Sequence, residues 1–163
     1  MKNLFFICPT DGLEMAIHNQ SSAKNYFLSS LGNALVFDQK AMIDIVDFII
    51  AKDIETVNCV LSTTNYIVAE MFEIGTVNPM DLQSKSDQNR KTRGKGKVIC
   101  LANDLSHSLV GLYLRKQLET LNAIIRSEHQ VNLNIQGYIF DSYTNKFIDL
   151  RPSGNVVERS TLN

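Results

Sequence analysis

Two apolar stretches of the sequence each end in polar side chains that could hold a ligand. Residues 56–61 (TVNCVL) lead into Ser62, Thr63, Thr64 and Asn65, and residues 3–8 (NLFFIC) end in Cys8 and lead into Thr10 and Asp11. Where a strand of a parallel sheet ends and a helix begins, free backbone N–H groups and the helix dipole favour anions. No group in residues 62–65 titrates near neutrality. We therefore expect no catalytic residue, and we predict a crevice that binds a small anion or a polar metabolite.

The same residues also have a purely structural interpretation. Ser, Thr and Asn at the start of a helix satisfy the free N–H groups of its first turn, so residues 62–65 could serve only as a cap. Cys8 has no base beside it in the sequence, so a buried structural thiol is the simpler interpretation. Capping and ligand binding both stay open, and binding of bicarbonate, phosphate or nucleotides would distinguish them.

The residues that most often bind transition metals are scattered along the chain: Cys8, Cys59, Cys100, His18, His107 and His129. None of the cysteines belongs to a C-x-x-C pair, and the histidines lack the spacing of metal ligands. The pattern predicts no structural zinc site, no disulfide framework and no cofactor.

A basic run suggests an alternative function. The five cations are Arg90, Lys91, Arg93, Lys95 and Lys97, interspersed with glycines. They could contact phosphate or nucleic acid in a salt-dependent way, although such a run is usually a solvated loop. No aromatic side chain lies among them for base stacking, which argues against nucleic acid as a partner.

Composition indicates one ordinary globular domain. A chain of 163 residues with 44% hydrophobic and 20% charged residues can bury a single sizeable core. The formal net charge of -1 gives no global attraction to nucleic acid or to an anionic membrane. The first apolar stretch is too short for a signal peptide or a membrane span, so we expect a cytoplasmic protein that does not contact membranes.

Apolar runs and helical stripes alternate along the chain, which predicts an α/β fold with a mainly parallel sheet flanked by helices. The expected strands are residues 3–8, about 25–29, 56–61, 97–102 and 131–140, and a C-terminal hairpin extends through 141–150. The expected helices are residues 11–19, 38–52 with Asp38 as N-cap, 64–73 and 104–126, with a loop at 75–97. We assign residues 1–150 to a single domain and 151–163 to a flexible tail.

The order of these segments resembles the β-class carbonic anhydrases. That family has a strand ending in C-x-D-S-R, then F-V-x-R-N-x-x-N, then a strand ending in G-H-x-x-C-G, and finally a hairpin of the type G-W-x-Y-D-x-x-T-G-x-L. The corresponding segments here are LFFICPTDG, YFLSSLGNAL, VNCVLSTTN and NIQGYIFDSYTNKFIDL, and a helix with GLYLRKQLETL precedes the last. The resemblance covers most of the chain and implies the family fold and a homodimer.

The residues that would carry the family's chemistry mostly differ. Cys8 falls on the first zinc-binding cysteine, but Thr10 stands at the aspartate position and Gly12 at the arginine position. Ser62 replaces the zinc-binding histidine and Asn65 the second cysteine. A catalytic zinc needs three protein ligands and an open water position, which Cys8 alone cannot provide. The resemblance therefore implies a zinc site that has lost most of its ligands.

Three hypotheses for function follow from the sequence. The leading one is a non-catalytic or repurposed relative of the β-carbonic anhydrases whose former crevice binds a small ligand. The second is a zinc-dependent carbonic anhydrase with an unrecognised ligand set. A shift of one residue would return Asp11 to the aspartate position, but it would not restore the histidine and the second cysteine. The third is a binding module that acts through the basic residues 90–97.

Overall fold

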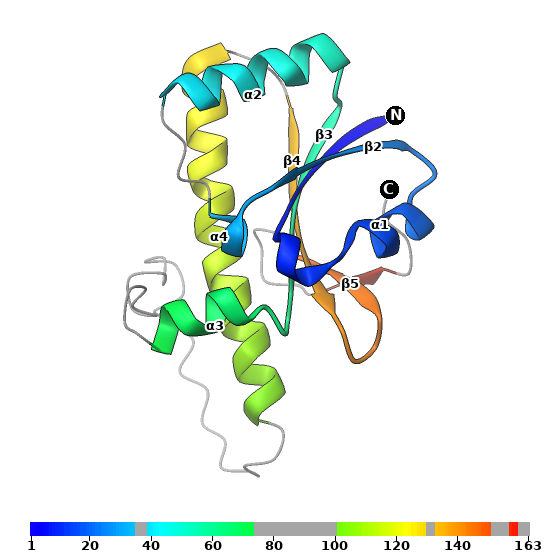
Figure 1. Cartoon of the computed structure of the whole chain (residues 1–163), viewed down its shortest axis with the longest axis vertical. Coiled ribbons are helices and arrows are strands. Elements are labelled where there is room, and N and C mark those ends of the chain that lie inside the picture. Colours follow the sequence, from blue (N-terminus) through cyan, green and yellow to red (C-terminus); the bar gives the residue numbers. More distant parts are fainter. Residues whose placement is uncertain (35–38, 74–100, 130–132, 151–156, 160–163) are drawn as a thin grey trace.

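The computed structural model describes residues 1–34, 39–73, 101–129, 133–150 and 157–159 (Figure 1). These residues form one six-stranded sheet with the order β2-β1-β3-β4-β5-β6. The four parallel strands are β1 (Lys2–Ile7), β2 (Lys24–Ser29), β3 (Thr56–Ser62) and β4 (Asn134–Asp141). The antiparallel strands are β5 (Lys146–Asp149) and β6 (Val157–Arg159). The predicted mainly parallel sheet with a C-terminal hairpin is confirmed.

Helices cover both faces of the sheet (Figure 1). On one face, α2 (Gln39–Lys52), α3 (Tyr66–Glu73) and α4 (Leu101–His129) enclose the larger core. The short α1 (Glu14–Gln20) packs on the other face, where Leu13 and Ile17 contact a smaller core. None of the helices within the described ranges is long and apolar enough to cross a membrane.

Strands β1 and β3 lie side by side in the middle of the sheet. Their side chains alternate between the two cores, so Phe6 and Leu61 face α2 and α4 while Ile7 and Val60 face α1. This double burial explains their continuous apolar sequences. Ile7 pairs with Val60, so the two strands end at the same edge of the sheet. The residues after β1 and at the end of β3 are thereby brought together.

The two helices that follow these strands begin later than the sequence predicts. Residues Pro9–Asp11 form a 3-10 turn, and Gly12 follows with φ 60, so α1 starts only at Glu14. Pro9 supplies the φ that the turn needs and Gly12 tolerates the left-handed conformation. Helix α3 begins at Tyr66 because Asn65 serves as its cap. Both delays add a polar turn at the same edge of the sheet.

Two other predictions differ in part from the structure. The strand expected at residues 97–102 is wrong for Leu101 and Ala102, which are the first residues of α4, and residues 97–100 lie outside the described ranges. A short apolar run does not by itself distinguish a strand from a buried helix. Within the segment expected to be a tail, residues 157–159 form β6 beside β5. The proposed cap Asp38 and the basic run 90–97 also lie outside the described residues.

Candidate functional site

The candidate site lies where β1 and β3 end. The thiol of Cys8, the 3-10 turn after it and the Ser62–Asn65 turn after β3 meet there, as predicted for the carboxyl edge of a parallel sheet. Most of these residues are buried or half-buried; Thr10 and Thr64 are exposed. The site is therefore a largely enclosed polar junction at the edge of the core.

Asp11 connects the two halves of this junction. Its Oδ2 accepts a hydrogen bond of 2.8 Å from the backbone N–H of Ser62, and its Oδ1 accepts one of 2.7 Å from the Nδ2 of Asn65. Burial raises the pKa of Asp11 above its ordinary value of 3.8, while the hydrogen bonds from Ser62 and Asn65 act in the opposite direction. The carboxylate is thus partly desolvated and held by two donors that come from β3 and the start of α3.

The turn between β3 and α3 satisfies its own backbone groups. The Oδ1 of Asn65 accepts the N–H of Val68 at 2.9 Å, which is the geometry of an N-cap. The Oγ of Ser62 accepts the N–H of Thr64 at 3.2 Å and lies 2.9 Å from the Thr64 hydroxyl. The N–H of Thr63 donates to a carbonyl of β4, that of Phe140, at 2.9 Å. The capping interpretation is confirmed for Asn65, and several N–H groups that an anion would need already have partners.

Cys8 is fully buried and has two neighbours that the sequence did not indicate. Its Sγ accepts the backbone N–H of Gly32 at 3.2 Å and lies 3.0 Å from the Oγ1 of Thr10. The next residue, Asn33, is also fully buried, and its Nδ2 donates to the carbonyl of Phe6 at 3.1 Å. Both Gly32 and Asn33 have positive φ, so the Gly-Asn pair was the signal for this turn, but not for its contact with Cys8.

Other titratable side chains near the core have structural environments. Burial in the larger core raises the pKa of the Cys59 thiol to about 12. Burial also raises the pKa of Tyr113 on α4, and the charge of Cys8 adds to this effect. Neither residue has the depressed pKa of an activated nucleophile.

The residues of the junction do not fit a zinc ion. Cys8 and Asp11 are the ligand types that zinc uses, but Ser62 and Asn65 stand at the other two positions and engage in hydrogen bonds. Among the side chains that the structure describes, no group of three or more His, Cys, Asp or Glu residues could hold a metal ion. Cys100 and the side chains of His107 and His129 lie outside that part of the structure. The donor set thus matches hydrogen bonding better than metal coordination.

Two buried polar atoms next to the junction have no hydrogen-bond partner: the Oγ1 of Thr63 and the Oδ1 of Asn33. Buried polar groups almost always have a partner in protein, water or a ligand. A separate apolar cavity of about 220 Å³ lies elsewhere, between the β1–β2 side of the sheet and α2, and its lining residues include Leu4, Ile45 and Phe48. The junction therefore contains buried polar atoms without a partner, whereas the separate cavity is mainly apolar.

Comparison with known proteins identifies the fold. No family model and no curated protein matches the chain. Among solved structures, it is similar to the wild-type β-carbonic anhydrase CafD of Aspergillus fumigatus, with a TM-score of 0.61 and 16% identity over 93% of this chain and 90% of CafD. The β-carbonic anhydrase CcaA gives a TM-score of 0.66 at 14% identity over 98% of this chain and 78% of CcaA. The Coccomyxa β-carbonic anhydrase gives 0.60 at 16% identity, over 91% and 71% respectively. The chain therefore has a β-carbonic-anhydrase-like fold.

Proposed function

We propose that this protein is a β-carbonic-anhydrase-like protein that holds no catalytic zinc and does not hydrate carbon dioxide by a zinc mechanism. The observation that carries the proposal is the pairing of Asp11 with Ser62 and Asn65. The resemblance assigns histidine and cysteine ligands to the positions of these two residues, yet here the backbone N–H of Ser62 and the side-chain amide of Asn65 donate hydrogen bonds to a carboxylate. A catalytic zinc with three protein ligands has no matching donor set at this junction.

Elemental analysis combined with a hydration assay tests this proposal. Purified protein, with and without added zinc, is expected to contain far less than one equivalent of zinc and to leave the rate of carbon dioxide hydration unchanged. About one zinc per chain together with hydration activity would favour the second hypothesis, a carbonic anhydrase with a different ligand set. An authentic β-carbonic anhydrase assayed in parallel is the positive control.

We further propose that the repurposed crevice binds a small polar ligand, through the predicted set Cys8, Thr10, Asp11, Ser62, Thr63, Thr64 and Asn65. Two observations support this role: the Oγ1 of Thr63 has no partner, and Thr64 beside it is an exposed residue. An anion would have to compete with Asp11 for the N–H of Ser62. Calorimetric titration with bicarbonate, phosphate and nucleotides tests the proposal, and no heat of binding from any of them would contradict it.

Self-association as a homodimer is also proposed. One of the solved structures with a similar fold describes two β-carbonic anhydrases of Sordaria macrospora as tetrameric, at 12% identity and a TM-score of 0.59 over 95% of this chain and 81% of that chain. Light scattering coupled to size-exclusion chromatography measures the mass in solution. A monomer at all concentrations would contradict the proposal.

A further inference from the structure

We infer that the Asp11 carboxylate has taken over the structural part of a metal site in this chain, linking the ends of β1 and β3 without any metal ion. The inference rests on the proposed absence of zinc, and it assigns a positioning role to a residue that the sequence comparison placed one position out of register. Asp11 lies 51 residues from Ser62 and 54 from Asn65 in the sequence, so each bond joins distant segments.

The chemistry of the three groups is complementary. An ionised carboxylate only accepts hydrogen bonds, whereas the backbone N–H of Ser62 and the amide Nδ2 of Asn65 only donate them. Hydrogen bonds to a charged acceptor are shorter and stronger than bonds between neutral groups, which agrees with the distances of 2.8 and 2.7 Å. A cation placed between Asp11 and these two groups would face N–H dipoles of the wrong sign.

The orientation of Asn65 is fixed by a second contact. Its Oδ1 is used by the N–H of Val68, so only its Nδ2 is available to Asp11. The carboxylate is thereby linked through Asn65 to the first turn of α3, as well as to the last residue of β3. Cys8, at the other side of the junction, is engaged by the N–H of Gly32. Asp11, Asn65 and Cys8 are therefore each matched by partners within the chain rather than by a shared ion.

The 3-10 turn explains why Asp11 can do this. Residues Pro9–Asp11 bring the chain back toward β3 before Gly12 redirects it, so the carboxylate faces the Ser62–Asn65 turn. If the strand continued as extended chain, the side chain of the aspartate would follow the alternation of the strand side chains between the two faces of the sheet. The one-residue displacement seen in the sequence is then a consequence of this local geometry.

A reciprocal exchange of the two side chains tests the inference. Asp11→Asn can satisfy only one of the two donors and turns an amide N–H2 group toward Asn65. Asn65→Asp keeps the acceptor for Val68 but places two carboxylates together. The double variant D11N/N65D restores one donor opposite one acceptor and leaves an acceptor for Ser62. Each single variant is expected to lower the melting temperature by roughly 3–10 °C, and the exchange to recover more than half of the summed loss.

The matched control is Asp53→Asn, the same chemical change at a carboxylate whose side chain is 88% exposed. It is expected to leave the melting temperature unchanged within error. Losses in the double variant that equal the sum of the single losses would overturn the inference, as would a D11N variant that is as stable as D53N. If a single variant does not fold, the wild-type protein provides the second test. In a pH titration by NMR, the Ser62 amide and the Asn65 side-chain amide should shift with one common midpoint, and the absence of such shifts would overturn the link.

Zinc content separates a failure of this inference from a failure of the proposed function. Addition of EDTA or of zinc should leave the wild-type melting temperature unchanged. Stoichiometric zinc, with destabilisation by EDTA, would overturn both conclusions. Absence of zinc combined with additive losses in the exchange would overturn only the role of Asp11.

Discussion

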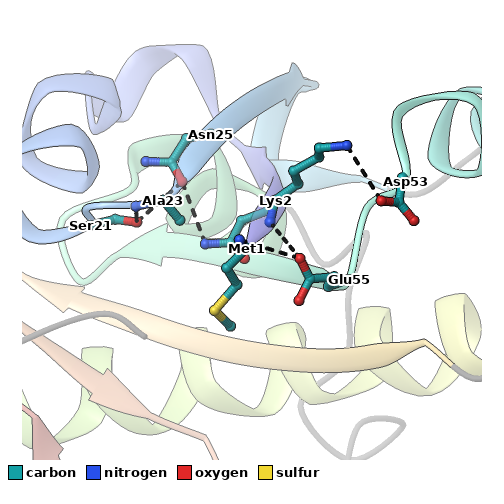
Figure 2. Close-up of polar contacts among 8 residues, drawn as sticks. Met1, Lys2, Ser21, Ala23, Asn25, Asp53 and Glu55 are labelled. Carbon is teal, nitrogen blue, oxygen red and sulfur yellow. Dashed lines mark hydrogen bonds and ion pairs between the residues drawn. The ribbon is translucent and has the colours of Figure 1, made fainter.

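Carboxylates join separate segments at both ends of the sheet, but the two ends differ in burial and in geometry. At the carboxyl end, half-buried Asp11 accepts hydrogen bonds of 2.8 and 2.7 Å. At the amino end, Asp53 and Glu55 lie 3.4 Å from the Nζ of Lys2 and from the terminal amine of Met1 respectively (Figure 2). Their side chains are 88% and 55% exposed. Glu55 also accepts the backbone N–H of Lys2 at 3.1 Å, but exposed ion pairs contribute little to stability, so we expect the carboxyl-end carboxylate to be the stronger structural link.

The asparagines of the two ends also differ in how fully their amide groups are hydrogen-bonded. Both amide atoms of Asn65 are hydrogen-bonded. In the amino-terminal half of the strands, Asn3 and Asn25 share one bond of 3.4 Å, and Asn25 also accepts from the hydroxyl of Ser21 at 3.2 Å (Figure 2). The Oδ1 of Asn3, the Nδ2 of Asn25 and both amide atoms of Asn58 have no partner. Asp11 and Asn65 thus have hydrogen-bond partners for their polar side-chain atoms, whereas Asn3, Asn25 and Asn58 do not have partners for all of theirs.

Replacing Asn65 by alanine should produce the largest loss of stability. Asn65→Ala removes the cap of α3 and leaves Asp11 without one of its two donors. The free energy of unfolding is expected to fall by about 2–4 kcal/mol, from the combined loss of a cap and of a buried hydrogen bond to a charge. Urea unfolding measures this change. A loss smaller than that of Ser62→Ala, which keeps the backbone N–H that Asp11 uses, would contradict the importance of the junction.

For Asn58→Val, the free energy of unfolding is expected to change in the opposite direction. Asn58 is 1% exposed in the central strand β3, and neither amide atom has a partner. Valine suits a buried strand and removes two unmatched polar atoms, so the free energy of unfolding should rise by about 1 kcal/mol. The same urea experiment checks it. A clear loss of stability would show that a bound water or ligand satisfies this amide in solution and would remove the contrast between the two regions.

Sequence alone predicted the architecture because burial on both faces leaves a strong signal. The apolar runs at β1 and β3 and the stripe of α2 follow directly from their double-sided or one-sided burial. The signal was weaker at 97–102, where a short apolar run fits either a strand or a helix. It was also weak at β6, whose three residues depend on pairing with β5 and not on a hydrophobic pattern of their own.

The candidate site was predicted as a set of residues but not as a network. The meeting of Cys8, Asp11 and Ser62 follows from the rule that parallel strands end at one edge. Which of them touch depends on the 3-10 turn after Pro9 and on the left-handed Gly12, and linear spacing does not report either feature. The contact of Gly32 with Cys8 joins residues 24 apart in the sequence, so no local sequence pattern reports it.

A pH titration of Asp11 in the wild type and in Asn65→Ala tests the hydrogen bond between these two residues. Burial raises the pKa of Asp11 above 3.8, and the bond from Asn65 lowers it, so Asn65→Ala should raise this pKa beyond the wild-type value. Because the folded-state pKa of Asp11 is raised, the stability that arises from this shift is fully present below the unfolded-state pKa. It is lost as the pH rises through the folded-state pKa. Carboxyl NMR from about pH 3 to about pH 7 measures both proteins. A midpoint in the variant below that of the wild type would contradict the assigned hydrogen bond.

The smallest effect is expected at the amino end, from Asp53→Asn. The carboxylate is 3.4 Å from the Nζ of Lys2, but solvent screens the pair and the long lysine side chain loses entropy when it is held in place. Asp53 also has a positive φ of 54, a conformation that asparagine adopts readily, so the substitution introduces no backbone strain. The free energy of unfolding should change by less than about 0.5 kcal/mol, and the change should vanish in high salt. A salt-independent loss comparable to that of Asp11→Asn would mean that the two ends of the sheet are linked by carboxylates of equal importance, and the role assigned to Asp11 would no longer be special to the candidate site.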